Sequence, residues 1–100
     1  MNKCFFLGSV LADSWFEEFD KTCRIEFNLE IQEKRKTKSG KTKIMINVLT
    51  FEAWDTAAVA IKDNIMEGDQ MLVEASARWE ESIDKTFFRV TNFKIFPSDN

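Results

Sequence analysis

The chain has 100 residues, 44% of them hydrophobic, with ten Phe and three Trp, which suits one domain around one aromatic-rich core. Its two Cys and its lack of His exclude a Cys–His metal site and any catalytic set that needs a histidine base. We therefore expect no metal, no cofactor and no enzymatic activity. No segment approaches membrane-spanning length, so we expect a soluble intracellular protein.

The positive charge is concentrated in one segment. The net charge is −3, from 14 basic and 17 acidic residues. Residues 34–43 hold six basic residues and no acidic one, so the other 90 residues have eight basic and 17 acidic side chains, a net charge of −9. The six are Lys34, Arg35, Lys36, Lys38, Lys41 and Lys43. This segregation predicts a basic projection on an acidic body, and such a projection suits a polyanionic partner.

The first third of the chain predicts two strands. Residues 3–11 form a largely apolar run typical of a buried strand, in which Gly8 permits a bulge or sharp curvature. Residues 13–22 predict a loop or short irregular segment, and we expect its Trp15 to cover one end of the core. Residues 23–32 place an apolar side chain at every second position, which indicates a half-buried antiparallel strand.

A long β-hairpin is predicted next. Residues 33–42 are polar and basic and form its arm and tip, and residues 43–53 form the returning strand. The first half of that strand is apolar on both faces, so we expect the core on one face and a partner subunit or a ligand on the other. Trp54 is in phase with Thr50 and Glu52, which favours an exposed ring over one in the core or a subunit interface.

The pattern changes to helical spacing at residues 55–66. Asp55 or Thr56 can serve as the N-cap, and Gly68 suits the position just after the end. One short helix is therefore predicted here.

Two more strands complete the chain. Residues 70–78 and 86–96 have strand patterns, joined by a charged turn at residues 80–85. The order β-β-β-α-β-β is that of the OB-fold, a five-stranded Greek-key barrel. The predicted class is therefore all-β with one short helix, as a single OB-fold domain over residues 1–96 with a short C-terminal tail at 97–100.

Several short pieces of the sequence carry a family likeness when they are taken in order. They are Met1–Lys3 with the apolar run to Gly8, Asp13, the strand from Ile25 to Ile31, the hairpin tip at Ser39 and Gly40, Ala53 and Trp54, then Glu67–Asp69 and Leu72–Glu74. Together they resemble the bacterial and phage single-stranded DNA-binding proteins. The resemblance implies an OB-fold homo-oligomer, a dimer or a tetramer. It also implies binding of single-stranded DNA with little sequence specificity during replication, recombination or repair, in the cytoplasm of a bacterial cell or phage-infected host.

The predicted DNA contacts combine the basic hairpin with aromatic side chains. The hairpin cations could instead serve only solubility and protection against edge pairing, but a single-strand binder needs a positive groove along the nucleic-acid backbone. Trp79 suits base stacking and simple edge packing equally. The predicted contacts are Lys34, Arg35, Lys36, Lys38, Lys41, Lys43, Trp54, Arg78 and Trp79.

The sequence departs from the family in three respects. Arg35 and Val48 stand where the resemblance places stacking aromatics, whereas Trp54 keeps one. A guanidinium plane can stack on a base and bind phosphate, but valine can do neither. The family's long C-terminal extension with an acidic tip, which recruits replication and repair proteins, has no counterpart in this sequence. Replication proteins therefore remain candidate partners without a predicted docking segment.

Subunit contacts and two other functions complete the predictions. The predicted oligomer interface comprises Lys3, Phe5, Ile44, Ile46 and Val48. The acidic balance and the missing aromatics also suit an OB-fold protein-interaction module with weak or lost nucleic-acid binding. A primosome-type OB protein, which would bind single strands as a dimer and contact a helicase, is the other alternative.

Overall fold

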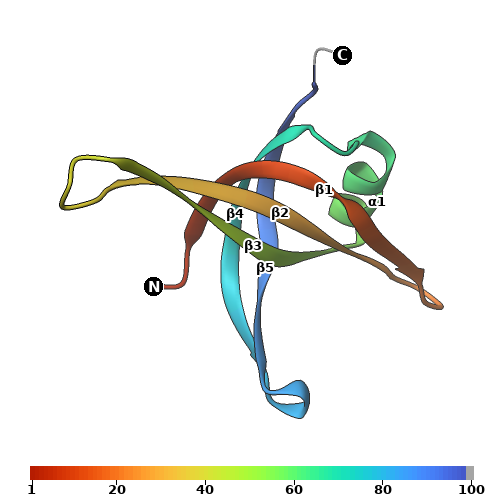
Figure 1. Ribbon diagram of the computed structural model, residues 1–100. Coiled ribbons are helices and arrows are strands. Elements are labelled where there is room, and N and C mark those ends of the chain that lie inside the picture. The colour runs from red at the N-terminus through yellow and green to blue at the C-terminus, as the bar shows by residue number, and fades with distance from the viewer. Residues whose placement is uncertain (99–100) are drawn as a thin grey trace.

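The computed structural model describes residues 1–98, which form one closed five-stranded barrel. Its elements are β1 (Cys4–Glu18), β2 (Cys23–Lys36), β3 (Thr42–Trp54), α1 (Asp55–Asn64), β4 (Gln70–Glu80), the short 3-10 helix η1 (Glu81–Ile83) and β5 (Lys85–Phe96). Around the barrel the strands follow the order β1-β2-β3-β5-β4 (Figure 1), and only the β3–β5 pair is parallel among these neighbours. The predicted OB-fold barrel with one α-helix is confirmed for the described residues.

Aromatic side chains fill the barrel. Phe27 of β2 and Phe51 of β3 are fully buried, and their ring centroids lie 5.5 Å apart. Phe6 of β1 meets Phe51 and Phe88 edge-on, with centroid distances of 5.6 Å and 5.0 Å. Because each such ring buries on the order of 150–250 Å², the rings stabilise this short chain while both cysteines remain free.

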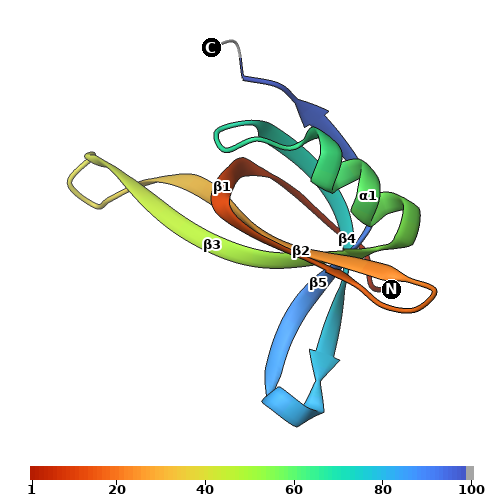
Figure 2. The ribbon, with the colours of Figure 1, turned by 90° about the vertical axis from the view of Figure 1, so that its right-hand side faces the viewer.

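The helix α1 covers one end of the barrel. Its Ala58 and Ile61, three residues apart on one helical face, are fully buried. In Figures 1 and 2 the helix lies at the opposite end of the barrel from the tip of the β4–β5 hairpin. After the helix, Gly68 adopts φ +92° and donates its N–H to the carbonyl of Val10 at 2.9 Å. A glycine turn thus follows the helix, but Gly68 is not the residue just after its end as predicted, because the C-cap is Ile65.

The predicted cap and end of the helix are wrong. The N-cap position belongs to Trp54, which makes no side-chain capping bond, and the helix ends at Asn64. Neither Asp55 nor Thr56 caps it, because the Asp55 carboxylate turns to the β1–β2 hairpin. There it accepts hydrogen bonds from the Thr22 hydroxyl and, at 3.3 Å, from the backbone N–H of Cys23.

The predicted loop over residues 13–22 is also wrong. Strand β1 continues to Glu18 after an irregularity between Val10 and Ser14, and only residues 19–22 form the turn into β2. Trp15 does not cover the barrel end. It pairs with Glu26 on the outer face of the sheet and is 62% exposed. A long curved strand carries its alternation past the end of the barrel, and so Trp15 points outward.

Two hairpins extend from the barrel. The β2–β3 hairpin projects to one side and the β4–β5 hairpin in another direction (Figure 1). At the C-terminal end, the Ser98 N–H donates to the buried Asp69 carboxylate at 2.9 Å. The predicted tail over residues 97–100 lies partly outside the described residues, which end at 98. Within the described part, no helix has the length and apolar character to cross a membrane.

Candidate nucleic-acid interface

The predicted contacts of the hairpin can be located from the register of β2 and β3. The two strands pair without interruption from Arg24 opposite Trp54 to Lys36 opposite Thr42. Side chains therefore alternate strictly between the two faces. Because Phe27 and Phe51 face the core, the even-numbered residues of both strands turn outward. Trp54 thus lies on the outer face, as the alternation predicts.

A groove of about 300 Å³ lies on this outer face and reaches to the β4–β5 hairpin. Its apolar lining comes from Trp54, Ile83 and Phe87. Its charged lining consists of four carboxylates and three cations, namely Glu17, Glu26, Glu52, Glu80, Arg24, Lys85 and Arg89. In OB-folds the face of strands 2 and 3, with the flanking loops, is the surface that binds oligonucleotides and oligosaccharides. Here that surface is partly aromatic and nearly balanced in charge.

Glu52 is the buried centre of the groove, and its side chain is only 5% exposed. Its carboxylate accepts hydrogen bonds from Arg24 Nε at 2.8 Å, Arg89 Nε at 2.8 Å and Trp54 Nε1 at 3.0 Å. Burial alone would raise the pKa of Glu52, but these hydrogen bonds outweigh it and the pKa lies below its ordinary value. Glu52 is therefore a fixed negative charge that orients three side chains.

Arg24 is held between two carboxylates. Besides Glu52, it contacts Glu26 through its Nη2 at 3.1 Å. Burial alone would lower the pKa of Arg24, but the hydrogen bonds to Glu52 and Glu26 outweigh it and raise that pKa. Arg24 is thus permanently charged, and its guanidinium is occupied inside the protein.

Trp54 is half-buried rather than exposed. One side of its ring faces Phe19 of the β1–β2 turn, with centroids 6.1 Å apart and planes inclined by 22°. Its N–H is taken by Glu52. The ring is therefore held in one orientation at the edge of the groove, which is the arrangement that a stacking platform requires.

The basic cluster divides between the two faces of the β2–β3 hairpin. Lys34 and Lys36 lie on the face of Trp54, whereas Arg35 and Lys43 pair with each other on the opposite face. Lys38 and Lys41 lie in the turn, which the Thr37 N–H closes on the Lys41 carbonyl at 2.8 Å. All six side chains are exposed. Lys36 is twelve positions after Arg24 in β2, so it lies about 40 Å along the strand from the Arg24 end of the groove.

Arg78 and Trp79 point to different sides of the β4–β5 hairpin. Arg78 pairs with Phe87 and shares the groove face, whereas Trp79 pairs with Thr86 and points to the other face. Trp79 is 61% exposed. The structure therefore does not bring Trp79 onto the surface that carries Trp54.

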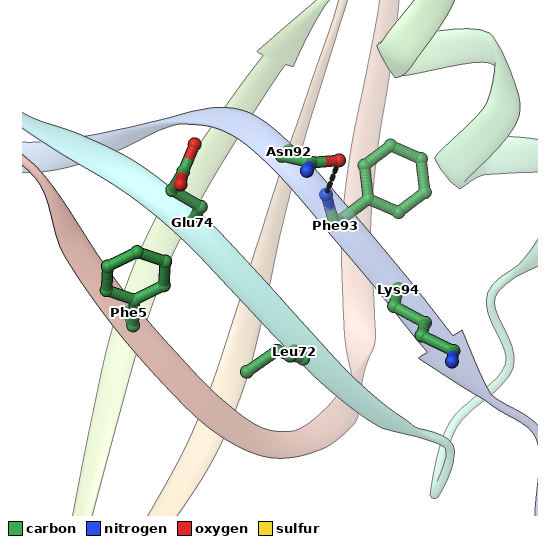
Figure 3. A pocket seen from close by; sticks show the side chains of 6 residues that line it. All are labelled: Phe5, Leu72, Glu74, Asn92, Phe93 and Lys94. Atoms are coloured by element: carbon green, nitrogen blue, oxygen red, sulfur yellow. Dashed lines mark hydrogen bonds between the residues drawn. The ribbon is translucent and has the colours of Figure 1, made fainter.

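The predicted oligomer residues lie in two places on the barrel exterior, with Lys3 and Phe5 beside β4 and the other three on the same outer face of β3 as Trp54, where Ile44 pairs with Lys34. Lys3 forms an ion pair with Glu74 at 3.5 Å, and Phe5 is 63% exposed. Figure 3 shows Phe5 on β1 beside Leu72 and Glu74 on β4, where these residues line a shallow pocket. The side chains of Ile44, Ile46 and Val48 are each more than half exposed on the outer face of β3.

Sequence reasoning missed the central roles of Glu52, Arg24 and Arg89. Glu52 was expected on the polar outer face, where nothing in its own strand signals burial. Its contact with Arg89 comes from the parallel pairing of β3 with β5, between residues 37 positions apart. The alternation of β2 and β3 places Arg24 beside Trp54, and that signal could have pointed to the Arg24–Glu52 pair.

Comparison with solved structures identifies the class of fold. A deletion variant of the single-stranded DNA binding protein from Thermus aquaticus superposes with a TM-score of 0.84 at 17% identity. The match covers 99% of this chain and 52% of that one, so the chain spans about half the length of that protein. No protein-family model and no curated protein matches the sequence.

Two further structures cover both chains almost fully. The small single-stranded DNA-binding protein from Streptomyces coelicolor has a TM-score of 0.74 at 13% identity, over 92% of this chain and 89% of that one. A Plasmodium falciparum protein of the same type, in complex with single-stranded DNA, has a TM-score of 0.76 at 15% identity, over 96% and 93%. The chain thus has the OB-fold of the single-stranded DNA-binding proteins, and the resemblance predicted from the sequence is confirmed at the level of the fold.

Proposed function

We propose that this protein binds single-stranded DNA with little sequence specificity and protects it in replication, recombination or repair. The observation that carries the proposal is that an aromatic ring and a cluster of cations occur together on β2 and β3. An oriented aromatic ring, Trp54, lies in the groove, and a cluster of exposed cations extends the same two strands. The shared fold with single-stranded DNA-binding proteins, one of them bound to DNA, supports the same conclusion.

The proposed path of the DNA follows the chemistry of this face. A base stacks on the free side of Trp54, which could contribute about 1–3 kcal/mol. Lys34 and Lys36, on the same face, and Lys38 and Lys41, at the tip, neutralise phosphates. Each such contact adds about 0.7 to the slope of log affinity against log salt. Arg78 extends the DNA-binding surface along β4. Trp79 points to the other face, so it contacts the DNA only where the DNA passes around the β4–β5 hairpin.

Fluorescence titration with an oligothymidylate tests the proposal. In a Trp15→Phe/Trp79→Phe background, Trp54 is the only tryptophan, and we expect the oligomer to quench its fluorescence. A matched Trp15→Phe/Trp54→Phe protein retains only Trp79 and should be quenched much less. If the protein fails to bind at low salt, single-stranded DNA is not its ligand.

We further propose a homo-oligomer, a dimer or tetramer, in which a second copy covers apolar strand surfaces. Phe5, Leu7 and Leu72 are exposed on the outer face of β1 and β4, where Leu7 and Leu72 are paired. Leu7 and Gln32 line one shallow pocket, and Gln32 pairs with Ile46. Exposed apolar side chains therefore continue from β4 to β3, and such patches mark protein interfaces. Light scattering of the wild type and of Phe5→Ser/Ile46→Ser would show whether this surface joins the copies.

A protein-interaction module is the second candidate. Four carboxylates in the groove oppose a polyanion, and Ile44, Ile46 and Val48 offer an apolar surface to a replication protein. Under this reading no oligonucleotide shifts the protein on a gel, even at low salt. A primosome-type role would instead combine single-strand binding as a dimer with capture of a helicase. Each of these roles places the protein in the cytoplasm, and none of them requires catalysis.

A further inference from the structure

One oxygen of Glu52 holds two side chains of the groove. Its Oε1 accepts hydrogen bonds from Trp54 Nε1 at 3.0 Å and from Arg89 Nε at 2.8 Å. The two donor nitrogens therefore lie less than about 6 Å apart. Glu52 and Arg89 are also register partners of the parallel β3–β5 pair, so both backbones fix this arrangement.

Arg89 differs from Arg24 in the number of guanidinium N–H donors that remain free for a ligand. Arg24 uses both Nε and a terminal nitrogen on carboxylates, and its side chain is 22% exposed. Arg89 uses only Nε, and its side chain is 39% exposed. Within residues 1–98, its two terminal nitrogens make no hydrogen bond. Arg89 thus presents a fork of N–H donors to the groove, the geometry that recognises phosphate oxygens.

We propose that Arg89 binds a backbone phosphate beside the base that stacks on Trp54, and that the buried Glu52 is the positioning residue for both. This inference rests on the proposed function. Because Trp54 and Arg89 donate to the same oxygen of Glu52, the indole ring and the free terminal nitrogens of the guanidinium lie close enough together to contact one nucleotide or two neighbouring ones. The groove therefore contains a prearranged unit that takes a base and its phosphate together.

Orientation matters here because the charge of the groove does not favour phosphate. The groove holds four carboxylates against three cations. A freely moving Arg89 could turn toward Glu17, Glu26 or Glu80, which line the same groove. The hydrogen bond to Glu52 holds Arg89 Nε toward the protein, and the terminal N–H donors of Arg89 remain free for the ligand. The negative charge of Glu52 repels DNA, whereas its hydrogen bonds orient the side chains that bind DNA. Substitution of Glu52 by Gln should therefore strengthen binding if the charge dominates and weaken it if the orientation dominates.

Affinity for oligothymidylate, measured over a range of salt concentrations, tests the proposal. Arg89→Gln should weaken binding about tenfold and lower the salt slope by about 0.7, since one phosphate contact is lost. The matched control is Lys62→Gln, which removes one exposed positive charge on α1, outside both the groove and the Phe5 pocket, and it should leave the slope unchanged. An Arg89→Gln slope equal to the wild-type slope would overturn the phosphate contact.

Glu52→Gln separates positioning from charge. Its side chain keeps the shape but faces three donors with an amide, so we expect weaker binding even though a negative charge has been removed. The double variant Glu52→Gln/Arg89→Gln should bind within twofold of the weaker single variant, because Arg89 without Glu52 is no longer oriented. Tighter binding by Glu52→Gln, or additive losses in the double variant, would refute the positioning role.

Arg89→Lys provides a variant that retains the charge if Glu52→Gln does not fold. It keeps the positive charge but lacks the planar fork, so affinity should fall while the salt slope stays near the wild-type value. Full affinity in Arg89→Lys would contradict the fork geometry. Absence of binding by the wild-type protein would refute the proposed function itself, whereas binding that is unaffected by any change at Arg89 would refute only this inference.

Discussion

The division of the basic hairpin between two faces gives a sharp test of where the DNA lies. Lys34 and Lys36 share the face of Trp54, while Arg35 and Lys43 are cross-strand partners on the other face. The double variants Lys34→Gln/Lys36→Gln and Arg35→Gln/Lys43→Gln remove the same charge from the same exposed hairpin. Any difference in DNA binding between the two variants therefore reports the path of the DNA and not the net charge of the protein.

The expected magnitude follows from the number of phosphates released. Loss of two phosphate contacts on the Trp54 face lowers the slope of log affinity against log salt by about 1.4. Between about 0.05 M and 0.2 M salt, that variant should then lose about sevenfold less affinity than the wild type loses. The variant of the opposite face should keep a slope close to that of the wild type.

Fluorescence titration with an oligothymidylate at four or more salt concentrations supplies the slopes, and circular dichroism confirms that both variants fold. Equal slopes in the two variants would refute the face assignment, because the hairpin would then act only as a diffuse positive charge. A larger change in Arg35→Gln/Lys43→Gln would place the DNA on the opposite face, away from Trp54.

Three other predictions concern stability and the groove. Gly8→Ala should lower the free energy of unfolding in urea by about 1–3 kcal/mol, because its Cβ would lie 2.7 Å from the Glu30 carbonyl oxygen, and wild-type stability would contradict this close approach. The lowered pKa of Glu52 means that its contribution to stability is present above pH 4.5 and is lost as the pH falls through the folded value, so urea titrations below pH 4.5 should show a shallower pH dependence in Glu52→Gln. Trp54→Ala should abolish most of the tryptophan quenching by oligothymidylate, and undiminished quenching would remove Trp54 from the site.

Local alternation explains which parts of the fold the sequence could predict. Strands β2 and β3 pair with each other through a single hairpin, so the face of each residue in Arg24–Lys36 and Thr42–Trp54 follows from the alternation. Strand β1 was predicted too short because its second half is rich in polar and aromatic residues and follows an irregularity at residues 10–14. Pairing with β2 makes this second half of β1 extended, and the strand propensity of its own residues does not predict that conformation.

The groove could not be predicted in full because it depends on contacts between distant strands. Closure of the barrel brings β5 beside β3 and places Arg89 against Glu52, and a period-two pattern carries no information about that pairing. Trp54 is half-buried because Phe19 of the β1–β2 turn packs against it, another contact between residues far apart in the sequence that the alternation does not show. Sequence alone therefore predicts the direction of a side chain better than its surroundings.

Charge and orientation are separated in this protein, which reconciles its net charge of −3 with a polyanionic ligand. The hairpin supplies exposed cations, whose contribution falls as salt screens and replaces them. The groove supplies an oriented ring and a guanidinium fixed by a buried carboxylate, and the stacking part of that contribution depends little on salt. Affinity measured at high salt should therefore report mainly the stacking on Trp54, and the additional affinity gained at low salt should report the hairpin cations together with the phosphate contact of Arg89. Because the two contributions come from different residues about 40 Å apart along the strand, each can be removed without the other.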